Sequence, residues 1–179
     1  MKLTIVRHAT TEANQKRLFN GQYDEDLSEQ GLQDLPKIVA KLHNLDIDVI
    51  ISSTLKRAIQ SATPICTDHN ITLQTDPRII ELNAGSFTMQ PTDSLKDTFG
   101  LTMPELLDTY QYDFTNFGGE SSVAVKKRVE DFLEDTRTIE ANHILIVTHG
   151  GIVRWLHYLI TGEKMGFSEN LAVHEYDDV

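Results

Sequence analysis

Short apolar runs that stop at polar residues recur along the chain and predict buried strands. Three of them cover residues 3–6, 48–53 and 143–148, and each is rich in isoleucine, valine or leucine. Runs of this length and composition are typical of strands that are covered on both faces. Residues 71–75 alternate between apolar and polar side chains and predict a further strand, and a short C-terminal strand is expected at 172–176.

Between these runs, apolar residues spaced by three and four predict helices. The first helix follows Ser28, a candidate N-cap, and Pro36 inside it favours a kink or a later start. Its expected apolar positions are Leu32, Leu35, Ile38, Val39 and Leu42. Further helices are expected directly after residue 53, in short pieces around 94–110, over 123–139 and from 150 to 160.

Strands that alternate with helices, joined by connections long enough for parallel crossovers, indicate an α/β fold. We therefore expect a three-layer α/β/α sandwich with a mostly parallel central sheet. Nothing in the composition marks a domain boundary, so residues 1–179 are expected to form one domain. Two irregular stretches interrupt the pattern, a polar loop at 11–27 and a lid or specificity insertion around 86–118.

The net charge of the chain limits the kinds of molecule that it is expected to bind. A formal net charge of −11 argues against binding to nucleic acid or to an anionic membrane, although one pocket can still be locally positive for a small anionic substrate. No apolar run approaches the roughly 20 residues of a membrane span. With a single cysteine, Cys66, that we expect in the core, a cytoplasmic location is predicted, and no feature indicates the oligomeric state.

Reactive polar residues follow the three apolar runs. Arg7-His8 comes after the first, Ser52-Ser53 with Arg57 after the second, and Thr148-His149-Gly150 after the third. The carboxyl ends of parallel strands meet at one edge of a sheet, which is where ligands bind in open α/β folds. Two arginines and two histidines are therefore expected to meet at one place in an otherwise acidic molecule.

Phosphoryl transfer is the chemistry that such a set could perform. Guanidinium groups match phosphate oxygens, and the helix start at Gly150 would add backbone donors. A neutral imidazole such as His8 can attack phosphorus, and an acid such as Glu81 could protonate the leaving oxygen. The chain has no Walker-type glycine loop and no carboxylate cluster for magnesium, so the cationic side chains would have to neutralise the charge in place of a metal ion.

Several motifs, in order along residues 3–156, resemble the histidine phosphatase superfamily in its branch with the cofactor-dependent phosphoglycerate mutases. Arg7-His8-Ala9 is similar to that family's Arg-His-Gly signature. Further residues are similar to the family's phosphate-binding loop: Thr11, Glu12, Asn14, Arg17, Asn20-Gly21, Asp24 and the helix start at Leu27-Ser28. The segment 52–62 with Arg57 resembles the second motif, and Arg78 to Glu81 with Gly85 resembles the proton-donor segment. Gly119-Glu120-Ser121 resembles the start of the long late helix, and Val147 to Gly151 the second histidine motif.

The resemblance implies a phosphatase that works in two steps on a small phosphorylated metabolite, with neither a metal nor an organic cofactor. His8 would attack phosphorus, and Glu81 would first protonate the leaving oxygen and then help water hydrolyse the phosphohistidine. The residues implied in catalysis are His8, Glu81, Arg7, Arg57 and His149. Those implied in substrate binding are Arg7, Thr11, Asn14, Asn20, Gly21, Arg57, Glu81, His149 and Gly150.

Two departures from the family pattern lie in the first motif. Ala9 replaces a glycine and would be costly if the backbone needed a positive φ there, and Thr10 replaces the usual acid or glutamine. Two alternatives to a phosphatase stay open, and only the second of them is supported by Ala9. One is a mutase that passes the phosphoryl group to an acceptor, against which the short, lysine- and arginine-poor stretch between Glu81 and Gly119 argues. The other is a member that binds phosphorylated ligands without turnover.

Overall fold

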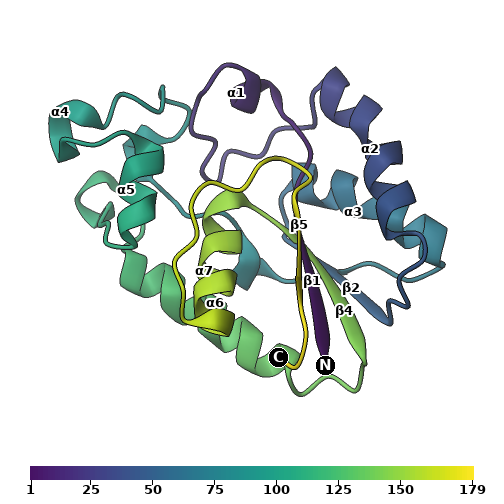
Figure 1. The fold of residues 1–179 in the computed structure, drawn as a ribbon. Helices are drawn as coiled ribbons and strands as arrows, with labels where there is room; N and C mark the ends of the chain where they lie inside the picture. Colours follow the sequence, from purple (N-terminus) through teal and green to yellow (C-terminus); the bar gives the residue numbers. More distant parts are fainter.

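A computed structural model describes all residues from 1 to 179 and shows a mixed α/β fold (Figure 1). The strands are β1 (Lys2–Arg7), β2 (Val49–Ser52), β3 (Gln74–Thr75), β4 (His143–Thr148) and β5 (Val173–Tyr176). The α-helices are α1 (Glu12–Gln15), α2 (Glu29–Leu42), α3 (Lys56–His69), α4 (Lys96–Phe99), α5 (Met103–Thr109), α6 (Ser122–Thr136) and α7 (Gly150–Thr161). Three short 3₁₀ helices are η1 (Pro77–Ile79), η2 (Gly85–Phe87) and η3 (Thr115–Phe117).

One five-stranded sheet, in the order β3-β2-β4-β1-β5, forms the centre of the molecule. All neighbouring strands are parallel except β5, which runs antiparallel to β1. The register pairs Arg7 with Thr148, so the residues that follow them, His8 and His149, leave the sheet side by side. The predicted three-layer α/β/α fold with a mostly parallel sheet is thus confirmed.

The sheet is buried on both faces because alternate residues of its strands enter two different cores. Ile144 and Ile146 of β4 join the core under α6 and α7, whereas Leu145 and Val147 join the core under α2 and α3. Figure 1 shows these two helix pairs on opposite sides of the sheet, with α4 and α5 beyond the upper end of α6 and α7. Side chains that point to opposite faces at successive positions explain why the strands appear as continuous apolar runs.

Helix α2 begins directly after the predicted cap, Ser28, and continues through Pro36. The Ser28 hydroxyl accepts a hydrogen bond from the Gly31 amide and donates one to the Thr10 carbonyl, both at 3.1 Å. These bonds fix the first turn ahead of the proline, and the helix runs unbroken to Leu42. The expectation of a later start is therefore wrong, and Leu32, expected on the apolar face, is 51% exposed.

Smaller differences concern the ends of elements. The polar stretch 11–27 contains α1, since Thr11 and Asn14 form a capping box that stabilises a single turn. Of the expected strand at 71–75, only β3 pairs with the sheet. The expected helix over 123–139 ends at Thr136. No helix of the fold is both long and apolar enough to span a membrane.

Candidate active site

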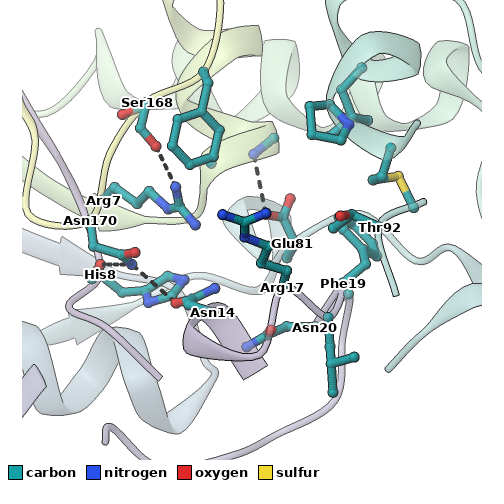
Figure 2. Close-up of a pocket in the computed structure, with 18 of the residues that line it drawn as sticks. Arg7, His8, Asn14, Arg17, Phe19, Asn20, Glu81, Thr92, Ser168 and Asn170 are labelled. Atoms are coloured by element: carbon teal, nitrogen blue, oxygen red, sulfur yellow. Dashed lines mark hydrogen bonds between the residues drawn. The ribbon is translucent and has the colours of Figure 1, made fainter. Parts of the chain in front are cut away.

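A cavity of about 380 Å³ opens at the carboxyl ends of β1, β2 and β4. Most of the residues predicted from the sequence lie on its wall (Figure 2). They are Arg7, His8, Asn14, Asn20, Gly21, Arg57, Glu81 and Gly150, together with Arg17 from the loop motif. Thr11 and His149 do not line the cavity but contact residues that do.

His8 is held in one tautomer. Its Nδ1 atom lies 2.7 Å from the carbonyl oxygen of Ala9, which can only accept a hydrogen bond. Nδ1 therefore carries the hydrogen, and the lone pair is left on Nε2. Burial, and after it the charges of Arg57 and Arg7, hold the pKa of His8 well below the usual 6.5, so the imidazole is neutral at physiological pH.

His149 packs against His8 with 5.1 Å between the ring centroids. Its Nε2 atom lies 2.7 Å from the hydroxyl oxygen of Ser53, at the end of β2, while its buried Nδ1 atom has no partner. Burial is again the main cause that holds the pKa of His149 well below 6.5, followed by the charge of Arg57. The site thus contains two adjacent neutral imidazoles.

Two buried arginines flank these rings. Arg57, on the first turn of α3, is fully buried and donates to the carbonyl oxygens of Tyr23 at 2.7 Å and Gly21 at 2.8 Å. Arg7, at the end of β1, donates to the Ser168 carbonyl, and burial lowers its pKa to about 10. Both guanidinium groups remain charged at neutral pH, and each keeps a buried Nε atom without a partner. They can therefore still donate to an anion in the cavity.

The loop that follows β1 forms a second wall. Thr11 caps α1 and accepts a hydrogen bond from the Asn20 side-chain nitrogen at 3.0 Å, so its hydroxyl positions Asn20. Gly21 has a φ of +49°, a left-handed conformation that suits glycine and turns its carbonyl oxygen to Arg57. Asp24 accepts from the Lys56 amide at 2.8 Å and so ties this loop to the start of α3.

Glu81 reaches the cavity from the segment between η1 and η2. Its carboxylate accepts hydrogen bonds from the amides of Leu82 at 2.9 Å and Gly151 at 3.2 Å. A Cβ atom on Gly151 would lie 2.5 Å from Glu81 Oε1, so any other residue there would force the carboxylate out of this position. The two amides fix the orientation of Glu81 and leave further lone pairs on both oxygens for a proton.

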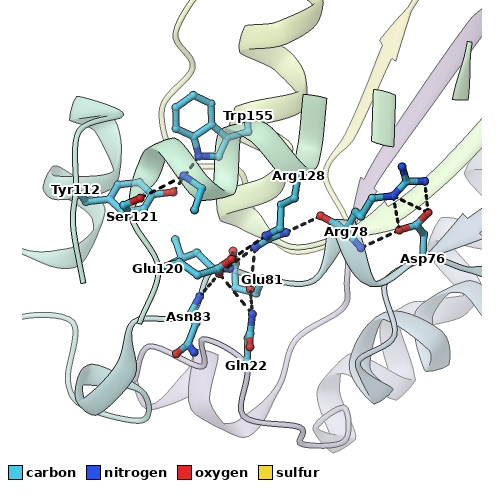
Figure 3. A network of polar contacts seen from close by, with 12 residues as sticks. Gln22, Asp76, Arg78, Glu81, Asn83, Tyr112, Glu120, Ser121, Arg128 and Trp155 are labelled. Carbon is cyan, nitrogen blue, oxygen red and sulfur yellow. Dashed lines mark hydrogen bonds and ion pairs between the residues drawn. The ribbon is translucent and has the colours of Figure 1, made fainter. Parts of the chain in front are cut away.

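A polar network behind Glu81 fixes its backbone (Figure 3). Gln22 and Arg128 both donate to the Glu81 carbonyl oxygen, at 3.0 and 3.3 Å. Glu120, from the Gly-Glu-Ser motif, forms an ion pair with Arg128 at 3.0 Å and accepts from the Asn83 amide at 2.8 Å. The motif that resembles a helix start therefore also connects α6 to the segment that carries Glu81.

The two departures in the first motif leave this geometry intact. Ala9 is fully buried, does not line the cavity, and does not belong to the residues with positive φ. Its amide donates to the Ser61 hydroxyl oxygen at 2.9 Å. The carbonyl of Thr10 packs against α2, where a Cβ atom on Gly31 would lie 2.1 Å away. The anticipated backbone cost at Ala9 is absent.

Sequence reasoning missed several residues of the cavity. Arg154, Phe167, Ser168 and Asn170 line it, as do Met103, Pro104 and Leu107 of the α5 region inside 86–118. Phe167 covers Arg7, with 5.0 Å from the guanidinium carbon to the ring centroid, and Asn170 donates to the His8 carbonyl at 2.8 Å. The C-terminal loop carried no motif. Arg154 did carry a signal, as the one charged residue in the apolar start of α7.

The assembled cavity suits a phosphoryl group. Four guanidinium groups and one carboxylate line it in a chain whose net charge is −11. A neutral imidazole with a free Nε2, cationic donors and a positioned carboxyl group provide a nucleophile, anion binding and proton transfer. No group of three or more histidine, cysteine, aspartate or glutamate side chains is arranged to hold a metal ion.

Comparison with known proteins identifies the family. The sequence model of the histidine phosphatase superfamily (branch 1) matches residues 3–177, and the chain belongs to this family. It is 31% identical to phosphoserine phosphatase 1 of Hydrogenobacter thermophilus, over 90% of this chain and 77% of that protein. It is also 31% identical to a Yersinia pestis protein named "Probable phosphoglycerate mutase GpmB", over 84% of this chain and 70% of that protein.

A solved structure of another protein has the same fold as this chain. The mycobacterial glucosyl-3-phosphoglycerate phosphatase superposes with a TM-score of 0.86 at 22% identity, over 97% of this chain and 91% of that chain. The family and the phosphatases among these relatives support the assignment of the chain as a phosphatase, as the sequence predicted. The expected resemblance to small phosphatases and to phosphoglycerate mutase-like proteins is confirmed.

Proposed function

We propose that this chain hydrolyses a small phosphomonoester through a phosphohistidine on Nε2 of His8. The observation that carries the proposal is the hydrogen bond from His8 Nδ1 to Ala9, since it leaves Nε2 unprotonated in a cavity lined by arginines. In the first step the bond from Nε2 to phosphorus forms while the bond to the ester oxygen breaks. The leaving oxygen takes a proton from the carboxyl group of Glu81.

In the second step water attacks the phosphohistidine. Glu81, now a carboxylate, takes a proton from this water, the phosphorus–nitrogen bond breaks, and inorganic phosphate leaves. Arg7 and Arg57 bind the phosphoryl oxygens through their free N–H groups, and His149 donates to them from Nδ1. These charged and polar donors neutralise the developing charge, which is why the proposed reaction needs no metal ion.

The remaining predicted residues support substrate binding. Asn14, Asn20 and Gly150 line the cavity near His8, whereas Thr11 and Gly21 hold Asn20 and Arg57 through hydrogen bonds. We propose one histidine phosphatase domain in which residues 86–118 act as the specificity insertion, because Met103 and Leu107 wall the cavity. The cytoplasmic location stays a prediction.

The relatives act on different substrates by name, so they do not fix the substrate of this chain. The test is a panel of phosphomonoesters incubated with the chain in the presence of a chelator, with His8→Ala as the inactive control. We expect phosphate release by the wild type only. Hydrolysis that survives in His8→Ala would remove His8 as the nucleophile. Phosphoryl transfer to added 3-phosphoglycerate in preference to water would favour the mutase, and tight phosphate binding without turnover would favour the binding protein.

A further inference from the structure

Arg154 is a buried arginine of the cavity that the two-step reaction does not use. It lies on α7, four residues after Gly150, and only 3% of its surface is exposed. Its Nη2 atom forms an ion pair with Asp108 of α5 at 3.0 Å. Its Nη1 atom is buried and has no hydrogen-bond partner, although the residue lines the cavity. An unpaired N–H of a buried cation is costly, so an anionic ligand atom would complete it.

The charges around the cavity leave room for a second anion. The phosphoryl group of a monoester carries nearly two negative charges at neutral pH. Arg7 and Arg57 would balance them while Glu81 holds the proton that it gives to the leaving oxygen. Arg154 and Arg17 then remain, and the only acidic partner of either is Asp108, which is half-exposed and lies outside the cavity wall. Figure 2 shows Arg7 and Arg17 directed into the same cavity.

The surroundings of Arg154 favour a small carboxylate over a second phosphate. Asp108 already pairs with Nη2 of the guanidinium group, so Nη1 is the terminal nitrogen that has no protein partner and is left for a ligand. Met103 and Leu107, from the same α5 segment, line the cavity with apolar surface. One guanidinium edge in an apolar wall matches a single charge, whereas a second phosphate would bring nearly two.

We infer that Arg154, with Arg17 at the exposed rim, binds a carboxylate of the substrate, and that the chain prefers phosphorylated carboxylic acids. The inference rests on the proposed function of the same cavity. Asp108 acts as a positioning residue that fixes the guanidinium plane and links α5 to the substrate. Residues 86–118 would thereby contribute to specificity through an ion pair as well as through apolar contacts.

The experiment compares substrates that differ only in the carboxylate. O-phosphoserine is paired with O-phosphoethanolamine, and 3-phosphoglycerate with glycerol 3-phosphate. For the wild type we expect kcat/KM to be about 10- to 100-fold higher for the carboxylate member of at least one pair, the range of a charge-assisted hydrogen bond. In Arg154→Met this ratio should fall to roughly 1, while kcat/KM for the partner without a carboxylate stays within about threefold.

Two controls keep the result interpretable. Arg137→Met removes an arginine that is exposed at the end of α6 and should leave the ratios unchanged. Calorimetric binding of each pair to His8→Asn, and to His8→Asn combined with Arg154→Met, measures the same preference without turnover. If the wild type hydrolyses both members of each pair equally and His8→Asn binds them equally, the inference is overturned and the phosphatase stands. If Arg154→Met weakens both members alike, Arg154 supports the fold and not the carboxylate.

A complete lack of hydrolysis would instead contradict the proposed function. The binding measurements then decide the inference alone. A preference for the carboxylate members that Arg154→Met removes would support it, and equal binding would overturn it.

Discussion

His8 donates its Nδ1 hydrogen to the carbonyl oxygen of Ala9, the next residue of the chain, across 2.7 Å. The residue that departs from the family's signature thus presents a backbone group, and not a side chain, to the catalytic candidate. A carbonyl oxygen is present whatever the side chain at this position. This explains how the chain can carry alanine there and still hold His8 with Nε2 free.

Burial of His8 and His149 as neutral rings makes stability depend on pH. Both folded-state pKa values lie well below 6.5, whereas the unfolded chain binds these protons near pH 6.5. The stabilising contribution is therefore present above pH 6.5 and is lost as pH falls toward the folded-state pKa values.

We expect the free energy of unfolding to fall below pH 6.5 by up to about 1.4 kcal/mol per pH unit for each histidine. Urea unfolding in phosphate-free buffer between pH 5.5 and 7.5 measures this slope. His8→Asn and His149→Asn should each remove the part of this slope that comes from the substituted histidine. An unchanged slope in both variants would show that neither ring is kept neutral by the fold.

Glu81→Gln tests the proton donor. Esters with poor leaving groups need the proton, so we expect kcat/KM for an alkyl phosphate to fall by roughly 10² to 10⁴. Nitrophenyl phosphate leaves without help and should lose less than about tenfold. Steady-state kinetics on both substrates with one enzyme preparation provide the comparison. Equal losses would take the acid role away from Glu81 and leave it only a part in positioning.

The neighbouring glycines 150 and 151 offer a matched pair of substitutions. A Cβ atom on Gly151 would lie 2.5 Å from Glu81 Oε1, whereas one on Gly150 would lie 3.4 Å from Arg7 Cζ, an ordinary contact. We expect Gly151→Ala to displace the carboxylate and reduce alkyl phosphate hydrolysis about 10- to 100-fold, since a misplaced proton donor loses most of its effect. Gly150 contributes to the site through the backbone of the helix start, which alanine retains, so Gly150→Ala should stay within a few fold. Similar activities of the two variants would contradict this role of Gly151.

A substitution at Gly31 tests the close packing of α2 against the backbone of Thr10. A Cβ atom there would lie 2.1 Å from the Thr10 carbonyl oxygen, a backbone atom that cannot rotate away. We expect Gly31→Ala to lower the free energy of unfolding by more than about 2 kcal/mol. Gly166→Ala, where nothing lies within 4 Å of the added atom, should change it by less than about 0.5 kcal/mol. Equal stability of both variants would mean that the loop moves freely.

The sequence predicted the sheet edge well for a simple physical reason. Apolar runs buried on both faces mark the strands, and parallel strands must place Arg7-His8 and Thr148-His149 together. Ser28 was recognisable as a cap because a serine hydroxyl just before a helix can accept a hydrogen bond from an amide of the first turn, here that of Gly31. These features depend on local chemistry and on strand direction alone.

Arg154 and Phe167 depend on packing between distant segments, which the sequence does not display. Arg154 of α7 pairs with Asp108 of α5, and Phe167 of the C-terminal loop covers Arg7. The start of α2 directly after Ser28 also involves a remote group, the Thr10 carbonyl that accepts a hydrogen bond from the Ser28 hydroxyl.

The central claim is that Nε2 of His8 becomes phosphorylated. Mixing the chain with a phosphomonoester that carries a radioactive phosphoryl group, and quenching within milliseconds in base, would trap this intermediate. The claim predicts a label that survives base, is lost in mild acid as a phosphoramidate, maps to the peptide containing His8, and is absent from His8→Asn. Turnover in the same experiment without any labelled protein, or a label on another residue, would contradict it.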